Sequence, residues 1–221
     1  MPHAWMSESA RAGSSKHRPT ALLPGGVLAG WLALVVVLGE RGSFQGAPGA
    51  PPLPMLLGAA LPLLAYAGAW RVPAFRAYAL AADLRIIVAV QGWRVVGFGF
   101  LALWAFGILP GMFAWPAGLG DMVVGFTAPW ILAALLRRPD FAASRVFRAW
   151  NLFGILDLLT ALALGGINAF LATGAAGTVS TRPMADLPLL LIPAYLVPLI
   201  LMLEITVLLQ LRAATRTHED H

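Results

Sequence analysis

Six polar or ionisable side chains interrupt the long apolar runs of this sequence, and they are the residues with chemistry to explain. They are Gln91, Arg94, Asp121, Asn151, Asp157 and Glu204. A charged side chain is costly in hydrocarbon, so such residues pair with one another and mark ion, proton or substrate sites. One arginine can bind two carboxylates, because its planar guanidinium offers five N–H donors. The set therefore predicts a buried ionic site.

The segments that carry these residues are long and apolar enough to cross a lipid bilayer. The chain is 11% charged, whereas an average soluble domain is roughly 25% charged. About 20 uncharged residues cross the ~30 Å hydrocarbon core as a helix, and helices satisfy their own backbone groups there. We expect six spans, at residues 21–39, 53–70, 86–109, 117–136, 149–170 and 187–211, with a tight turn at 110–118.

The basic residues predict how these spans are oriented. Of the 15 lysines and arginines, only Arg41 and Arg182 fall in the loops on one side and Arg94 within a span. The others lie on the opposite side, which the positive-inside rule assigns to the cytoplasm together with both termini. The sequence thus predicts an all-α, polytopic six-helix membrane bundle at 21–211. Mobile tails are expected at 1–20 and 212–221.

A signal peptide is the alternative interpretation of the N-terminal segment. Residues 1–20 are basic and residues 21–39 are apolar, as in a secretory signal. The apolar run is longer than the usual 7–15 residues of such a signal. An uncleaved first span is therefore favoured.

Three charged residues are expected at a similar depth in the membrane. At ~1.5 Å rise per residue, Arg94 and Asp157 lie about 12 Å, and Glu204 about 10 Å, from the cytoplasmic ends of their spans. Gln91 is one turn from Arg94, and Asn151 is near the inner mouth of its span. The ionised trio would carry a net charge of −1. Two alternatives stay open: Arg94 snorkels to the headgroups, or the carboxyl groups are neutral because they are buried.

Asp121 is expected apart from this trio, near the outer side of the fourth span. A carboxylate in the first turn of a helix is stabilised by the helix dipole, and an outer gate or ion entry point is the functional alternative. Several glycines would let helices approach closely. Two prolines would kink the sixth span just before Glu204. The glycines are Gly92, Gly97, Gly99, Gly120 and Gly125, and the prolines are Pro193 and Pro198.

Motifs for cofactors and covalent catalysis are absent from the sequence. There is no cysteine, and His3, His17, His218 and His221 all lie in the terminal segments. We therefore expect no metal, no cofactor and no catalytic residue. The only lysine is Lys16, which excludes a retinal Schiff base within the bundle. The excess of arginine acts in topology, so no nucleic-acid partner is expected.

Three stretches resemble an uncharacterised family of small bacterial polytopic membrane proteins. They are PGMFAWPAGLGDMVVGFTAP (110–129), WNLFGILDLLTA (150–161) and IPAYLVPLILMLE (192–204). The resemblance extends over about residues 91–211, carries no known activity, and implies that Arg94, Asp121 and Asp157 belong to one pattern. High alanine, glycine, arginine and leucine usage is typical of a GC-rich genome and favours a bacterial inner membrane.

Three functions are compatible with these observations. The first is a transporter of a small solute or ion, with a polar cavity open to the cytoplasm and a carboxylate that carries the proton. The second is an accessory or assembly subunit that binds a membrane-protein partner or a further copy of itself. The third is an enzyme acting on a lipid head group, with two carboxylates and an arginine for acid–base chemistry and phosphate binding.

Overall fold

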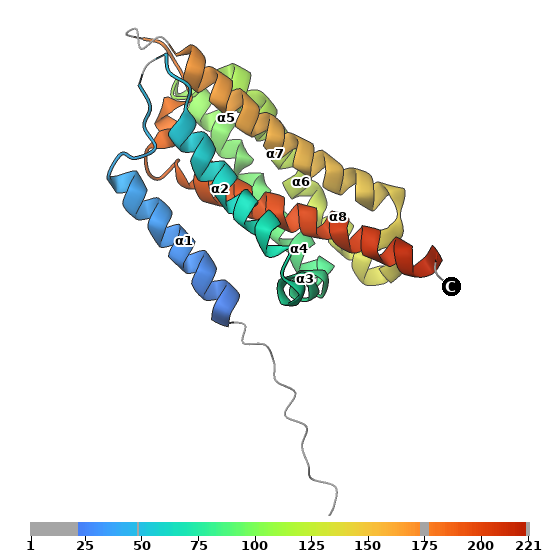
Figure 1. The fold of residues 1–221 in the computed structure, drawn as a ribbon. Helices are drawn as coiled ribbons and strands as arrows, with labels where there is room; N and C mark the ends of the chain where they lie inside the picture. The colour runs from blue at the N-terminus through green and yellow to red at the C-terminus, as the bar shows by residue number, and fades with distance from the viewer. Residues whose placement is uncertain (1–21, 48, 173–176, 220–221) are drawn as a thin grey trace, which may run out of the picture.

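The computed structural model describes residues 22–47, 49–172 and 177–219, and their regular structure is helical throughout. The long helices pack side by side as an elongated bundle (Figure 1). In chain order the elements are α1 (Leu22–Glu40), α2 (Leu53–Ala69), α3 (Pro73–Leu80), α4 (Leu84–Gln91), η1 (Gly92–Gly97), α5 (Phe98–Ala105), α6 (Gly111–Arg137), η2 (Pro139–Ala143), α7 (Arg145–Leu171), η3 (Arg182–Ala185), η4 (Ile192–Leu196) and α8 (Val197–Glu219).

Four helical segments of the described chain are long and apolar enough to cross a membrane. They cover Leu84–Ala105, Gly111–Arg137, Arg145–Leu171 and Ile192–Ala214. Helices α2 and α3 pass the same test as a pair, but the chain bends by 103° between them, and α1 is a shorter apolar helix. The structure thus supports four to five spans by length and composition.

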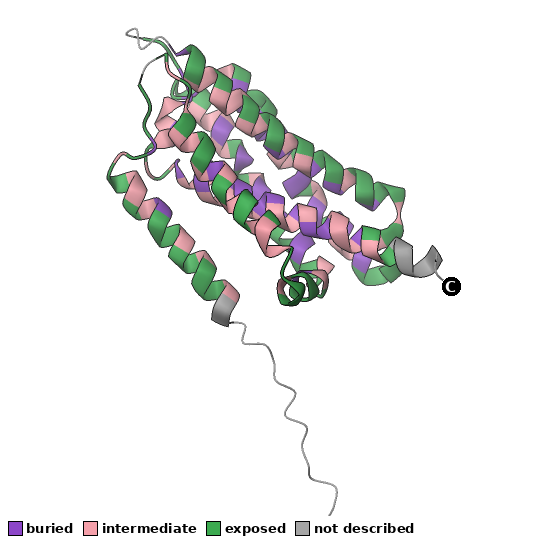
Figure 2. Ribbon diagram, viewed as in Figure 1, coloured by how far each residue is buried: buried purple, intermediate pink, exposed green. Residues whose placement is uncertain are grey.

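The outward faces of these helices are apolar, which is also compatible with a membrane protein. Exposed residues run along the outer faces of α1 and α7 (Figure 2). Val27, Trp130 and Leu156 keep 70%, 70% and 62% of their surface exposed. Contiguous apolar surface of this kind marks an interface with lipid or with another protein.

The third apolar segment is not one regular helix. Helix α4 passes into the 3₁₀ helix η1, which carries Arg94, and then into α5. A 3₁₀ stretch inside a longer helix is typical of a functional or strained position. Helix α6 packs against η1 backbone to backbone, because a Cβ atom on Gly125 would overlap with the Val95 nitrogen.

The predicted turn at 110–118 was wrong. The reversal lies earlier, around Gly107 with its positive φ of 68°, and α6 begins at Gly111 and continues through Pro116. Two prolines and two glycines suggested a turn, but Phe113, Ala114 and Ala117 are fully buried against α5. This packing outweighs the low helix propensity of the segment.

The last span begins irregularly and ends late. The chain enters it through the π-helical turn η4, which contains Pro193, and continues without interruption into α8. Helix α8 extends to Glu219, so residues 212–219, predicted as part of a tail, are helical. The tail predicted at 1–20 lies outside the described residues.

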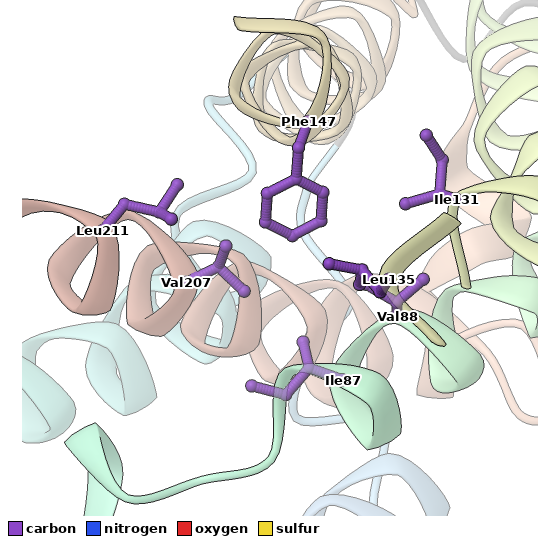
Figure 3. Close-up of a cluster of buried hydrophobic side chains, with 7 residues drawn as sticks. All are labelled: Ile87, Val88, Ile131, Leu135, Phe147, Val207 and Leu211. Atoms are coloured by element: carbon purple, nitrogen blue, oxygen red, sulfur yellow. The ribbon is translucent and has the colours of Figure 1, made fainter. Parts of the chain in front are cut away.

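One end of the bundle is closed by a hydrophobic plug, which we define as seven buried side chains from four helices. Phe147 of α7 points between α4, α6 and α8 and has no exposed surface (Figure 3). This is the arginine-rich end, because Phe147 lies between Arg145 and Arg148 in the chain. The plug consists of Ile87, Val88, Ile131, Leu135, Phe147, Val207 and Leu211.

Candidate functional site

Arg94 lies at the centre of the bundle and binds three carboxylates at once. Its Nε donates to Asp121 Oδ1 at 2.7 Å, its Nη1 to Glu204 Oε1 at 2.9 Å, and its Nη2 to Asp157 Oδ2 at 2.5 Å. Nη2 also donates to the Gly154 carbonyl oxygen at 3.4 Å. Arg94 is 2% exposed, so it does not snorkel. We call Arg94 and the three carboxylates the charge cluster.

Each carboxylate occupies space left by a glycine on the neighbouring helix. A Cβ atom on Gly97 of η1 would overlap with Asp121 of α6, and one on Gly120 of α6 would overlap with Asp157 of α7. A Cβ atom on Gly154 of α7 would likewise overlap with Glu204 of α8. Three small residues therefore let three acidic side chains from successive spans reach one guanidinium. Of the five glycines that the sequence predicted for close helix approach, Gly97, Gly120 and Gly125 are close-packed, whereas Gly92 and Gly99 have nothing within 4 Å of an added Cβ.

The charge cluster is unbalanced. One guanidinium faces three carboxyl groups, so the cluster would carry a charge of −2 if every group were ionised. An uncompensated charge in a buried site costs several kcal/mol. The excess negative charge must therefore be balanced by bound protons or by a cationic ligand. Among the residues that the structure describes, no group of histidine, cysteine or carboxylate side chains is arranged to hold a metal ion.

The three carboxylates differ in access. The side chain of Asp121 is 17% exposed, that of Asp157 is 7% exposed and that of Glu204 is 1% exposed. Asp121 lines a cavity of about 240 Å³ whose walls come mainly from α2, α6, α7 and the loops before α2 and η4. Because it includes the exposed loop residues Gln45 and Asp186, the cavity opens at the end opposite the hydrophobic plug. We call it the main cavity.

The main cavity opens at the opposite end of the bundle from the one that the sequence predicted. The sequence predicted an opening at the arginine-rich end, but the main cavity opens at the end that carries Arg41 and Arg182. The prediction placed the polar residues correctly along the helices but had no information on which side chains seal the bundle. Phe147 and its neighbours seal the arginine-rich end.

Two polar contacts join the loops at the mouth of the main cavity. Gln45 Nε2 donates to Asp186 Oδ1 at 2.6 Å, and Arg182 Nη2 donates to the Gly46 carbonyl oxygen at 2.6 Å. All four residues line the cavity. The contacts tie the loop before α2 to the segment before η4.

A second cavity, of about 190 Å³, reaches the charge cluster from another direction. Arg94 and Asp121 line it together with Trp93 and residues of α5, η4 and α8. Asp121 lines both cavities. It is therefore the member of the cluster that a ligand in either cavity would meet.

Gln91 and Asn151 lie one helical turn from the charge cluster, toward the plug. Asn151 Nδ2 donates to the Glu204 backbone oxygen at 3.1 Å. Gln91 is 1% exposed, and neither its amide nitrogen nor its amide oxygen has a hydrogen-bond partner in the described structure; Glu204 Oε2 is also unpartnered. Buried polar atoms without partners are unusual and call for an explanation such as water or an ion.

The predicted convergence of Arg94, Asp157 and Glu204 is therefore confirmed as a buried salt-bridge cluster. The structure differs at Asp121, which was expected apart from the trio. Helix α6 begins ten residues before Asp121, so this side chain lies well inside the helix and faces Arg94 rather than a helix terminus. Gly154 was not singled out in the sequence. It belongs to the site because its lack of a side chain leaves the space that Glu204 occupies.

The fold and the site together define an all-helical protein with apolar helices of membrane-spanning length and a buried arginine–carboxylate cluster. The chain belongs to the family described as Domain of unknown function (DUF8737), whose model matches residues 51–212. The matched region contains the whole charge cluster and leaves out α1. No curated protein and no solved structure matches the chain.

Proposed function

We propose that this protein is a six-span membrane transporter that moves a small solute or ion against protons through the charge cluster. Helices α1 and α2 would add two spans to the four long ones. The helix order then puts the arginine-rich loops at one end, as the positive-inside rule requires of a cytoplasmic face. Both termini would be cytoplasmic, in a bacterial inner membrane.

The observation that carries this proposal is the excess of negative charge at the closed end of a cavity. A purely structural ion pair needs one partner for each charge, whereas Arg94 has three. The two surplus negative charges suit a site that exchanges protons for a cation or a cationic solute. Asp157 is the proposed proton carrier, because it binds Arg94 and its side-chain exposure is intermediate between that of Asp121 and that of Glu204.

The two ends of the bundle fit one state of an alternating-access cycle. The main cavity leads inward from the Arg41 and Arg182 side to Asp121, while the hydrophobic plug closes the opposite side. The irregular segment η4 lines this cavity through Ile192 and Pro193, and η1 carries Arg94, which binds Asp121 at its inner end. We propose that opening the plug while the loops at the cavity mouth close would expose the charge cluster to the cytoplasm, where a cation replaces the bound protons.

Everted membrane vesicles provide the test of this function. Respiration acidifies the vesicle lumen, and a pH-sensitive dye reports proton release when inorganic and organic cations are added in turn. We expect at least one cation to dissipate the gradient with wild-type protein, with loss of this response in Asp157→Asn. Asp140→Asn, which changes a carboxylate outside the cluster, should behave as wild type.

Two results would count against the proposal. An unchanged response in Asp157→Asn would remove the proton role of that residue. If no cation of the panel elicits proton movement from folded protein, and a second membrane protein co-purifies in a fixed ratio, the accessory-subunit interpretation replaces transport.

A further inference from the structure

The main cavity combines an apolar wall with a single carboxylate at its inner end. Phe100 and Phe113 form an edge-to-face pair with ring centroids 5.3 Å apart, and Leu158 and Ile192 continue the apolar lining. Asp121 is the carboxylate that lines this cavity from within the bundle. Pockets for small organic ligands have this composition, with apolar walls and few polar groups that fix orientation.

The charge at the inner end favours a cation over a neutral or anionic ligand. Asp121 already accepts a hydrogen bond from Arg94 Nε, but Arg94 is shared with two further carboxylates. The local field at Asp121 is therefore negative unless protons are bound. Arg182, the positive group at the mouth, has its Nη2 bonded to the Gly46 carbonyl oxygen, and Asp186 adds another carboxylate there.

The size of the main cavity limits the ligand. Its volume is about 240 Å³, whereas an apolar cavity of roughly 150 Å³ accommodates benzene, so one aromatic ring with a short polar arm fits. A hydrated inorganic cation would leave the aromatic and aliphatic wall without a role. A compact organic amine with one aromatic or branched apolar group would fill the volume.

We infer that the main cavity binds a small amphipathic organic cation, with its ammonium group at Asp121 and its apolar body between Phe113 and Leu158. This inference names the substrate class of the proposed transporter and in that respect rests on it. The aromatic pair adds a favourable surface for a cation that enters past it. Binding of the cation would supply one of the positive charges that the cluster lacks.

Equilibrium dialysis of purified, detergent-solubilised protein tests the inference directly. The probe is radiolabelled 2-phenylethylammonium, and protein-free micelles give the background. We expect saturable binding that unlabelled 2-phenylethanol, a neutral molecule of the same shape, does not displace at equal concentration. Asp121→Asn should weaken binding at least tenfold, whereas Asp140→Asn should bind as wild type.

A second variant guards against misfolding of Asp121→Asn. Ala161→Leu fills the main cavity from α7 and leaves all four members of the charge cluster in place, and we expect it to abolish binding while the protein stays monodisperse. Absence of saturable binding to wild type, equal displacement by 2-phenylethanol, or unchanged binding in both variants would overturn the inference. Equal displacement would instead indicate an apolar pocket for a lipid chain.

The dialysis result and the vesicle result separate the two proposals. Dialysis needs no proton gradient. Proton movement driven by inorganic cations, without binding of the amine, would therefore overturn only the substrate class. Binding of the amine without any proton movement would overturn transport and leave an amine-binding membrane protein.

Discussion

Gly154 and Glu204 are in such close contact that a single added methyl group at Gly154 would overlap with Glu204 Oε1 and press on Arg94 Nη1. The glycine thus determines how near α8 approaches α7 at the charge cluster. The same relationship recurs between Gly97 and Asp121 and between Gly120 and Asp157.

Gly154→Ala is therefore expected to destabilise the protein. Overpacking a tight site costs about 1–3 kcal/mol, which exceeds the roughly 0.5–1 kcal/mol that alanine contributes over glycine inside a helix. The matched control is Gly166→Ala on the same helix, where an added Cβ lies 3.7 Å from Leu56 in ordinary contact. Thermal unfolding in detergent should show a lower midpoint for the first variant only; equal midpoints would refute the glycine argument.

Removing Arg94 should be more damaging than removing any one of its partners. Arg94→Gln leaves three buried carboxyl groups without their cation, and breaking a buried pair in this way costs about 3–5 kcal/mol. Arg94→Lys should also be impaired, because an ammonium group cannot reproduce the guanidinium fork. Denaturant unfolding measures both effects.

The rescue of Arg94→Gln provides the control for that experiment. Adding Asp121→Asn, Asp157→Asn and Glu204→Gln makes the cluster neutral, and we expect this variant to recover part of the lost stability. If the combined variant is less stable than Arg94→Gln alone, unbalanced charge is not the cause of the damage.

Water is expected to reach Ala161 from the Arg41 and Arg182 side of the protein. Ala161 lines the main cavity. Ala163, two residues on in α7, does not line it and is exposed on the outer surface, which would face lipid in a membrane. A membrane-impermeant thiol reagent should label Ala161→Cys when added to that side and leave Ala163→Cys unlabelled. The chain contains no cysteine, so each variant carries a single thiol.

The labelling also tests whether the hydrophobic plug closes the arginine-rich end. Labelling of Ala161→Cys only from the arginine-rich side would place the opening at the wrong end. A cysteine at Gly154 is unsuitable as a probe, because any side chain there disturbs the charge cluster.

Gln210 is expected to stabilise the bend between α2 and α4. Its Nε2 donates to the carbonyl oxygens of Ala79, Leu80 and Ala82 at 3.0, 3.2 and 2.9 Å, which caps the end of α3. Gln210→Leu keeps the size but removes the donor to Leu80 and Ala82, while Ala79 keeps its bond from the Ala82 N–H; we expect a cost of about 1–3 kcal/mol. An unfolding midpoint equal to that of wild type would show that water replaces the amide without loss.

The sequence predicted the location of the charge cluster because helical rise converts residue number into depth. Arg94, Asp157 and Glu204 were matched in this way, and they are bonded in the structure. Depth does not reveal which way a helix is rotated, and rotation decides whether Asp121 joins the cluster. Asp121 was placed apart from the cluster for a second reason, since its distance from the helix start depended on a misplaced turn at 110–118.

Other features could not be predicted because they depend on packing between distant segments. The short helix α3 begins at Pro73, two residues after Arg71, and offers no long apolar run, so it was not predicted. The hydrophobic plug draws its side chains from four helices, and leucine, isoleucine or valine at those positions suits a lipid-facing surface equally well.

The order of charges along the chain has a consequence for biosynthesis. Arg94 precedes each of its partners, by 27 residues for Asp121, 63 for Asp157 and 110 for Glu204. At about 5–20 residues per second, the last partner is made roughly 5–20 s after the arginine. In a membrane, the unpaired arginine must be sheltered meanwhile, by the insertion machinery or near the lipid surface. Helix by helix, each new span would then lower the cost of retaining the arginine in the membrane.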